Sequence, residues 1–227
     1  KLLPELSKID GVKRIRLSYL QPAEMRPTLL QAMIENEKVA PYFDLSFQHS
    51  APDVLRAMRR FGDSEKFLHL ISQIRALSPD AGIRSNFIVG FPGETQQDFD
   101  KMMRLIDDVG FDASFSFVFS ARPGTPAANL PDDTPQAVKL ERLQHLQATL
   151  ENHVRAISAQ RVGTVQRILV EGPSRKNAAE LMGRTECNRI VNFDGGPLSS
   201  RLVGQMMDVR ITQALPHSLR GDMLLLD

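Results

Sequence analysis

Cysteine is nearly absent from this chain, and so are long apolar runs. Cys187 is the only cysteine among 227 residues, which excludes an internal disulfide bond and any metal site built from several thiolates of the chain itself. No apolar run approaches about 18 residues, so we expect no membrane-spanning helix. The sequence also shows no basic leader followed by an apolar stretch, and we expect a cytoplasmic protein.

An excess of one charge sign is also lacking. The net charge is +1, and 42% hydrophobic with 24% charged residues is typical of a globular protein. From residue 160 onward, nine Lys or Arg face seven Asp or Glu, an excess too small to predict nucleic-acid binding by itself. The chain opens on Lys1 within KLLPELSKI, and we expect that an upstream part of the protein precedes it.

The first 120 residues alternate between strand-like and helix-like patterns, which predicts parallel strands covered by helices. Strands are expected at residues 13–20, 42–48, 83–91 and 114–120, and helices at 27–36, 52–60, 64–77 and 96–109. Residues 135–161 predict one long helix. Beyond Gly163, short alternating segments with Gly-rich turns predict a small β-barrel, the last segment being GDMLLLD.

The segment IRSNFIVGFPGET, residues 83–95, breaks from a strand into a Gly-rich turn just before a helix. Gly90 and Gly93 lack a Cβ atom, so a ligand could approach the main chain there, while Pro92 restricts the loop. Thr95 can cap the following helix. We expect Gly90 to serve ligand approach more than packing. An ordinary strand-to-helix connection is the alternative.

Polar or special residues follow the ends of the four predicted strands. In barrel-like α/β folds the carboxyl ends of the strands build the active site, which makes the clustering informative. The alternative is that polar residues simply mark where strands stop. The residues are Ser18, Tyr19, Gln48, His49, Ser50, Gly90 through Glu94, Ser120 and Arg122.

Three segments resemble the radical S-adenosylmethionine methylthiotransferases: FIVGFPGET, FSARPGTPAANLPD and VQRILVEGPSRKNAAELMGRTECNRIVNF. The last two are similar to the tRNA branch, which adds a methylthio group to an isopentenylated adenosine beside the anticodon. The resemblance implies the C-terminal part of a partial TIM-like α/β barrel in residues 1–159 and an RNA-binding TRAM barrel in residues 160–227. It also implies a tRNA anticodon stem-loop and an electron donor protein as partners, and we expect a monomer.

The sequence departs from the family in two ways. It lacks the CxxxCxxC motif, so the four-iron, four-sulfur clusters would be held by upstream residues and this stretch alone should be inactive. In addition, SYLQPAEMRP and APYFDLSFQHS are more similar to the sister branch, which modifies an aspartate of a ribosomal protein. A seam near residues 86–96 would fit a recombined, designed or divergent chain. The alternatives are therefore a ribosomal-protein methylthiotransferase and a non-catalytic RNA-binding fragment.

The resemblance also implies roles for individual residues, although spacing alone assigns none of them. Glu94 is placed with the cofactor group but is expected mainly to pin the turn. For the cofactor, S-adenosylmethionine, the expected residues are Gln48, Ser85, Asn86, Ile88, Gly90 and Glu94. For the substrate they are His49, Ser120 and Arg122, and for RNA phosphates Arg167, Arg175, Lys176, Arg184 and Arg189. No metal ligand is expected in this stretch.

Overall fold

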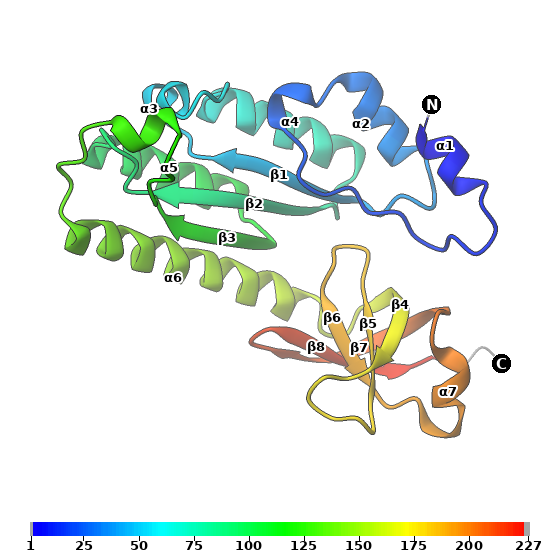
Figure 1. Ribbon diagram of the computed structural model, residues 1–227. Coiled ribbons are helices and arrows are strands. Elements are labelled where there is room, and N and C mark those ends of the chain that lie inside the picture. Colours follow the sequence, from blue (N-terminus) through cyan, green and yellow to red (C-terminus); the bar gives the residue numbers. More distant parts are fainter. Residues whose placement is uncertain (1, 225–227) are drawn as a thin grey trace. The chain divides into compact units, whose positions relative to one another are not determined.

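The computed structural model describes residues 2–224, which divide into two compact units (Figure 1). The sheet unit consists of Ser18–Leu30 and Phe43–Val154. The barrel unit consists of Lys1–Leu17, Gln31–Tyr42 and Arg155–Asp227. No helix within the described residues has both the length and the apolar composition needed to cross a bilayer.

A three-stranded sheet in the order β1-β2-β3 forms the centre of the sheet unit. Its strands are β1 (Tyr42–Gln48), β2 (Gly82–Val89) and β3 (Ala113–Val118). The β2 and β3 strands are parallel, with Asn86 opposite Phe115 and Ile88 opposite Phe117. Figure 1 draws all three arrows in the same direction, so the three carboxyl ends lie at one edge, as the alternating sequence pattern predicts.

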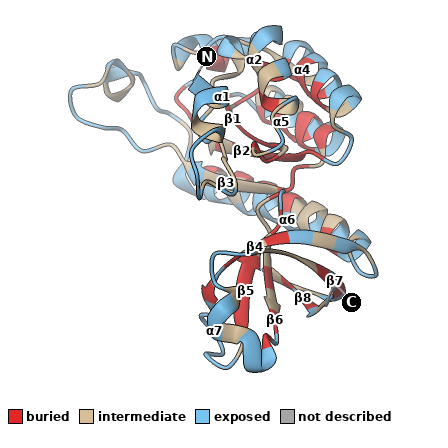
Figure 2. Ribbon diagram, turned by 90° about the vertical axis from the view of Figure 1, so that its right-hand side faces the viewer, coloured by how far each residue is buried: buried red, intermediate tan, exposed pale blue. Residues whose placement is uncertain are grey.

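Helices cover this sheet. Their apolar residues recur at helical spacing, so they lie on one face of each helix, which can pack on the strands. Figure 2 shows the strands β1 and β2 largely buried, while the helices carry mixed buried and exposed faces. Phe47 of β1 stacks on Phe67 at 4.2 Å between ring centroids, and Phe111 packs edge-on against Phe47 and Phe87. The helices that belong wholly or partly to the sheet unit are α2 (Pro27–Ile34), α3 (Pro52–Ala57), α4 (Ser64–Leu77), α5 (Gln96–Val109) and α6 (Gln136–Gln160), whereas α1 (Leu2–Ser7) belongs to the barrel unit.

Local hydrogen bonds set the ends of α4 and α5. Thr95 and Asp98 form a reciprocal capping box at the start of α5, which confirms Thr95 as its cap. The carboxylate of Asp63 accepts from the Lys66 backbone N–H at 2.8 Å and caps α4. Gly110, with φ 61°, ends α5 in the left-handed conformation typical of a glycine at a helix C-terminus.

The strand predicted at residues 13–20 is wrong. This segment makes only two isolated bridges, one from Ile15 to Val39 and one from Leu20 to Leu45. Between these bridges Tyr19 adopts φ 59°, which interrupts the extended backbone. The apolar alternation that suggested a strand therefore reflects two short pairings with different neighbours.

The predicted small barrel is closed, in the strand order β4-β5-β6-β8-β7. All neighbouring pairs are antiparallel except β6 with β8. Its interior is a cluster of buried apolar side chains that includes Ile168, Val170, Val209 and Ile211. The strands are β4 (Val165–Pro173), β5 (Leu181–Arg184), β6 (Ile190–Phe193), β7 (Met206–Leu215) and β8 (Ser218–Met223).

Short helical turns connect these elements. They are η1 (Pro22–Glu24), η2 (Pro126–Asn129), η3 (Gly196–Leu198) and α7 (Ser199–Leu202). The end of the predicted segment GDMLLLD, residues 225–227, lies outside the described residues.

Replacing Asp63 with alanine should lower the free energy of unfolding by about 1 kcal/mol at pH 7, because the cap of α4 is lost. Hydrogen bonds from Lys66 lower the pKa of Asp63 in the folded state. The cap therefore contributes fully above the unfolded pKa and is lost as pH falls through the lowered folded pKa. Denaturant titrations should show the difference from wild type shrinking below about pH 4.

Asp53→Ala provides the matched control, because Asp53 is an exposed carboxylate paired only with Arg56 three residues away. Such surface pairs contribute little, so its free energy of unfolding should barely change. An equal loss in both variants would show that the capping bond contributes nothing of its own.

Candidate functional site

A cavity of about 620 Å³ lies where the carboxyl ends of the three parallel strands meet in the sheet unit. Gln48 ends β1, Ile88 lies near the end of β2, and Val118 ends β3. The other lining residues come from the end of α3 and the residues that follow it, from the turn after β2, from the end of β3 and from the loop after β3. They are Ala57, Met58, Arg59, Arg60, Phe91, Phe117, Phe119, Ser120, Arg122, Thr125, Pro126 and Ala127.

One wall of the cavity is apolar and held rigidly. The rings of Phe91 and Phe119 meet edge-to-face, with centroids 4.8 Å apart. Phe91 belongs to a buried cluster with Ala51 and Val54, against which Met58, Phe119 and Ala127 pack. This packing joins the turn after β2, the helix α3 and the loop after β3, so the wall is formed by contacts among all three.

The rim of the cavity is cationic. Arg59, Arg60 and Arg122 line it, and among its described lining residues none is an Asp or a Glu. The guanidinium of Arg60 donates to the side-chain oxygen of Gln21. The Arg122 carbonyl accepts hydrogen bonds from both the N–H and the hydroxyl of Thr125, at 3.1 and 2.8 Å, which fixes the loop that carries this arginine. The cavity therefore favours a ligand with an apolar part and a negative charge.

Behind the cavity, the side chain of Glu94 is fully buried and fully engaged. Its Oε2 accepts from the Gly90 N–H at 2.9 Å, and its Oε1 accepts from Arg142 Nη1 at 2.7 Å. Arg142 lies on α6, so the carboxylate ties the turn to that helix. Removing one partner of such a buried ion pair typically costs about 3–5 kcal/mol. Glu94 thus pins the turn, as the sequence predicts, and it does not line the cavity.

His49 completes this buried arrangement. Its Nδ1 accepts from the Ala51 N–H at 3.0 Å, so the proton lies on Nε2, which faces Glu94 Oε2 at 3.4 Å. The side chain is fully buried. His49 does not line the cavity, and it shapes the turn after β1 and lies against Glu94. Its expected contact with substrate stays a prediction.

Gly90 packs closely against α6, which favours a packing role, while the expected ligand approach stays a prediction. A Cβ atom at this position would lie 2.5 Å from Cγ and 2.7 Å from Cδ of Lys139. The residue also has φ 66°, which disfavours any side chain. The space that the missing Cβ leaves open is filled by the Lys139 stem.

The other predicted cofactor residues divide into two groups. Gln48 and Ile88 line the cavity, and Gln48 holds φ 67°, a strained backbone conformation for this residue type. Ser85 is buried away from it, where its hydroxyl accepts from the Phe47 N–H at 3.3 Å. Asn86 accepts from Arg84 at 3.0 Å and does not line it either. The structure therefore brings together only Gln48 and Ile88 of this set.

Of the predicted substrate residues, Ser120 and Arg122 both line the cavity and are exposed. The expected site included neither Arg59 nor Phe117 nor Phe119, whereas Phe91 falls within the expected segment from Gly90 through Glu94. Phe117 and Phe119 alternate along the end of β3 and its extension, and such alternation could have indicated one shared face.

The five cations predicted to contact RNA lie in the barrel unit, but not all are free to do so. Arg175 and Lys176 are exposed in the loop between β4 and β5, and Arg167 is exposed on β4. Arg184 instead lies 3.2 Å from Glu171, and Arg189 donates to the Ser158 hydroxyl at 3.3 Å. The loop pair is thus the better placed for phosphate contacts.

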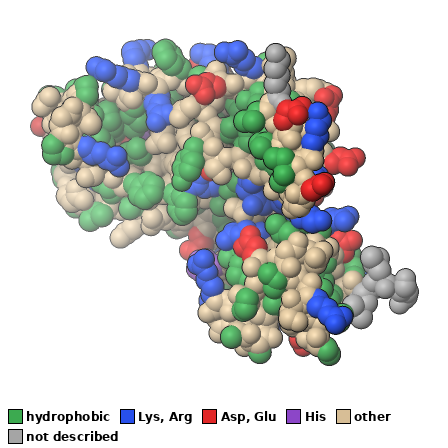
Figure 3. Space-filling view, turned by 45° about the vertical axis from the view of Figure 1, so that its right-hand side comes forward, with side chains coloured by type: hydrophobic (Ala, Val, Ile, Leu, Met, Phe, Trp, Pro, Cys, Tyr) green, Lys and Arg blue, Asp and Glu red, His purple; other side chains and the backbone are tan. Residues whose placement is uncertain are grey.

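Two arginines of the barrel unit, Arg14 and Arg16, lie in the segment that was expected to be a strand, and their hydrogen bonds were not expected. Arg14 donates to the Arg184 carbonyl at 2.6 Å, and Arg16 donates to the Thr185 carbonyl at 3.0 Å. Burial lowers the pKa of both guanidinium groups. The face drawn in Figure 3 carries both basic and acidic side chains, in line with a net charge near zero.

The described residues do not bring together three or more His, Cys, Asp or Glu side chains that could hold a metal ion. Cys187 is buried, with the Thr185 hydroxyl 3.2 Å from its sulfur atom. One thiol cannot replace the several thiolates that an iron–sulfur cluster requires. Residues of this chain therefore do not fit such a cluster.

Two family profiles match the chain. The Radical SAM superfamily matches residues 1–106, and the TRAM domain matches residues 159–224. Two relatives are named tRNA-2-methylthio-N(6)-dimethylallyladenosine synthase. The protein of Leptothrix cholodnii is 55% identical over 100% of this chain, and that of Verminephrobacter eiseniae is 56% identical over 97%. The chain spans about half of their length, 48% in each case.

A solved structure shares the fold. Coproporphyrinogen III oxidase (HemN) from Escherichia coli, a radical SAM enzyme, aligns with a TM-score of 0.56 over 98% of this chain and 56% of that chain. At 14% identity the similarity concerns the fold alone.

The expected resemblance of the N-terminal third to the ribosomal-protein branch, and with it a seam near residues 86–96, finds no support. Relatives of one description match essentially the whole chain. Within this N-terminal third, His49 is buried between Ala51 and Glu94, so packing constrains this residue.

Gly90→Ala should lower the free energy of unfolding by roughly 2–5 kcal/mol, the sum of about 1–2 for the left-handed backbone and about 1–3 for overlap with Lys139. Gly93→Ala is the matched control: it has φ 85°, but nothing lies within 4 Å of its missing Cβ, so only the backbone cost applies. Denaturant unfolding of both variants measures the difference.

Lys139→Ala in the same chain should recover part of the Gly90→Ala loss, because it removes the overlapping Cγ and Cδ atoms. Equal losses in Gly90→Ala and Gly93→Ala would show that packing on α6 does not require this glycine.

Proposed function

The chain belongs to the radical S-adenosylmethionine methylthiotransferase family, in its tRNA branch, and we propose that it is the C-terminal portion of a tRNA 2-methylthio-adenosine synthase. The observation that carries the proposal is the 55–56% identity to such synthases over nearly the whole chain. The complete protein would methylthiolate an isopentenylated adenosine beside the anticodon.

When bound, S-adenosylmethionine and a four-iron, four-sulfur cluster would supply the radical chemistry that activates the adenine carbon. The cluster does not fit this chain and would be held by residues outside it. The cofactor fits the cavity better. Gln48 offers an amide that can both donate and accept, and Ile88 offers an apolar face beside it. A cavity of about 620 Å³ is within the usual range for small-molecule sites.

The residues of this chain would bind and position the reactants and exclude water. Phe91 and Phe119 would form an apolar wall for a base or an alkyl group, and Glu94 and Arg142 would hold that wall against α6. Ser120 and Arg122 would contact the substrate at the rim. Cytoplasmic localisation, a monomeric state and an electron donor protein remain predictions.

Anaerobic reconstitution of this chain with iron and sulfide should leave it without stoichiometric iron, because a cuboidal cluster needs several thiolates and the chain has one. Iron counting after desalting is the measurement. One cluster's worth of iron bound to the monomer would contradict the assignment of the cluster to residues outside the chain.

The chain should bind an anticodon stem-loop RNA with marked salt dependence, since Arg175 and Lys176 are exposed cations on one loop. Each phosphate contact adds about 0.9 to the slope of log affinity against log salt for duplex nucleic acid. Reversing both residues to glutamate should therefore lower the affinity and reduce the slope by about 2. Titrations at several salt concentrations measure both quantities.

The matched control reverses Lys8 and Lys66, exposed cations that are already paired with Glu5 and Asp63. It changes the net charge equally and should alter the slope less. A flat salt response in the wild-type chain, or preferential binding of a basic ribosomal protein, would favour the ribosomal-protein branch instead.

A further inference from the structure

The helix α3 ends in a turn that normally requires glycine. The Arg60 N–H donates to the Leu55 carbonyl at 2.8 Å and the Arg59 N–H to the Arg56 carbonyl at 2.9 Å. This is the hydrogen-bond pattern of a Schellman motif, whose left-handed position is most often glycine. Here that position is Arg59, with φ 57°. A left-handed backbone costs a residue with a Cβ atom about 1–2 kcal/mol.

Contacts within the described protein do not explain why an arginine stands there. Arg59 is exposed, and no described residue forms a hydrogen bond or an ion pair with its guanidinium. A cation near the end of a helix interacts favourably with the helix dipole. Arg56 and Arg60 already provide that interaction without a left-handed backbone. No contact within the described protein therefore offsets the backbone strain at Arg59. Strained backbone conformations of this kind cluster at functional sites.

The position of Arg59 indicates what it could bind. It lines the cavity at the carboxyl ends of the strands, together with Arg122 on the opposite loop. Arg60 is already engaged with Gln21, and no carboxylate among the described lining residues competes for the two remaining guanidinium groups. Next to them lie Phe117, which is 56% exposed, and Phe119. An apolar surface beside two cations complements a nucleotide, which combines a stacking base with a phosphate.

We propose that Arg59 binds a backbone phosphate of the RNA beside the nucleotide whose base enters the cavity, an inference that rests on the proposed function. The planar guanidinium can make two parallel hydrogen bonds to phosphate oxygens. The Schellman turn fixes the backbone of Arg59, so the side chain starts from a defined position at the rim. Arg59 is a substrate-positioning residue in this arrangement.

The decisive variant is Arg59→Gly, because the change should affect stability and binding in opposite directions. Glycine relieves the left-handed backbone, so the melting temperature should stay the same or rise. Loss of one charge-assisted phosphate contact should weaken anticodon stem-loop binding about tenfold. The salt slope should fall by about 0.7, the value for one phosphate of a single strand. Arg59→Lys should restore the slope but only part of the affinity.

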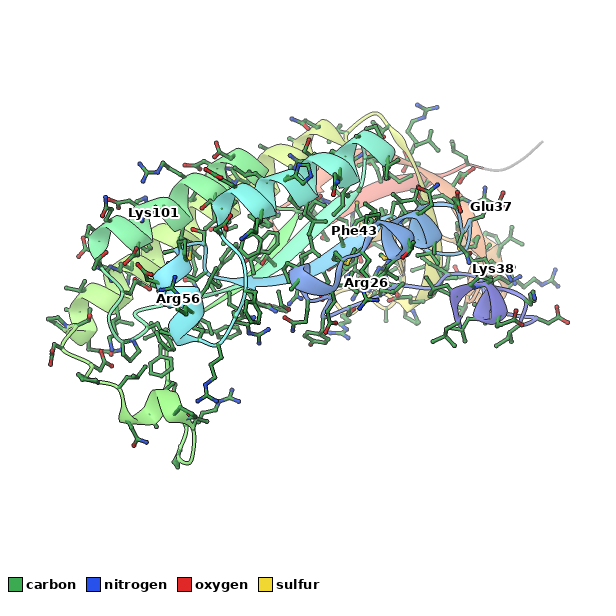
Figure 4. The ribbon with its side chains drawn as sticks, turned by 90° about the horizontal axis from the view of Figure 1, so that it is seen from above. Arg26, Glu37, Lys38, Phe43, Arg56 and Lys101 are labelled. Carbon is green, nitrogen blue, oxygen red and sulfur yellow. The ribbon has the colours of Figure 1, made fainter. Side chains whose placement is uncertain are left out.

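Arg56→Gln is the matched control. Figure 4 shows Arg56 on the same helix, where it is exposed and pairs with Asp53. This variant removes the same charge from outside the cavity lining, so affinity and slope should remain near those of wild type. The measurements are RNA titrations at several salt concentrations, thermal unfolding, and calorimetric titration with S-adenosylmethionine.

Equal RNA binding by wild type and Arg59→Gly would overturn this inference alone, as would an equal loss in Arg56→Gln. Weakened S-adenosylmethionine binding with unchanged RNA binding would also overturn it, because the cation would then serve the cofactor carboxylate. If the wild-type chain bound no RNA, the proposed function would fail and the inference with it.

Discussion

The buried carboxylate of Glu94 is the constraint on which the site depends. A charge removed from water is tolerated only when partners satisfy it, and here these are the Gly90 N–H and Arg142. Because one partner belongs to the turn itself and the other to α6, one side chain joins these two segments. Phe91, which forms part of the apolar wall, lies between Gly90 and Glu94 in the chain, so the same contacts hold it in place.

This constraint separates the residues that build the turn from those that face a ligand. Gly90, Glu94 and His49 all serve the buried side, where Lys139 fills the space beside the glycine. Gln48 and Ile88 face the cavity instead. A motif can therefore include residues that maintain the shape of the loop and do not line the cavity.

Helices whose ends depend on local hydrogen bonds could be predicted from the sequence. The limits of α4 and α5 follow from Asp63 and Thr95, side chains that act within three residues. The segment at residues 13–20 was mispredicted because its pairing depends on distant neighbours. In the site, the location at the strand ends was predictable but side-chain directions were not. Burial of Ser85 and His49 and the left-handed Arg59 are consequences of tertiary contacts.

Low net charge bears on how the proposed RNA recognition would work in this chain. A total charge of +1 offers little long-range attraction for a polyanion. The proposed affinity would then come from a few cations at defined positions, such as Arg175 and Lys176 on one loop and Arg59 at the end of α3. Where few contacts carry the binding, each has a larger share of it. Under that condition, a strained arginine can be retained in place of the glycine that the fold alone would favour.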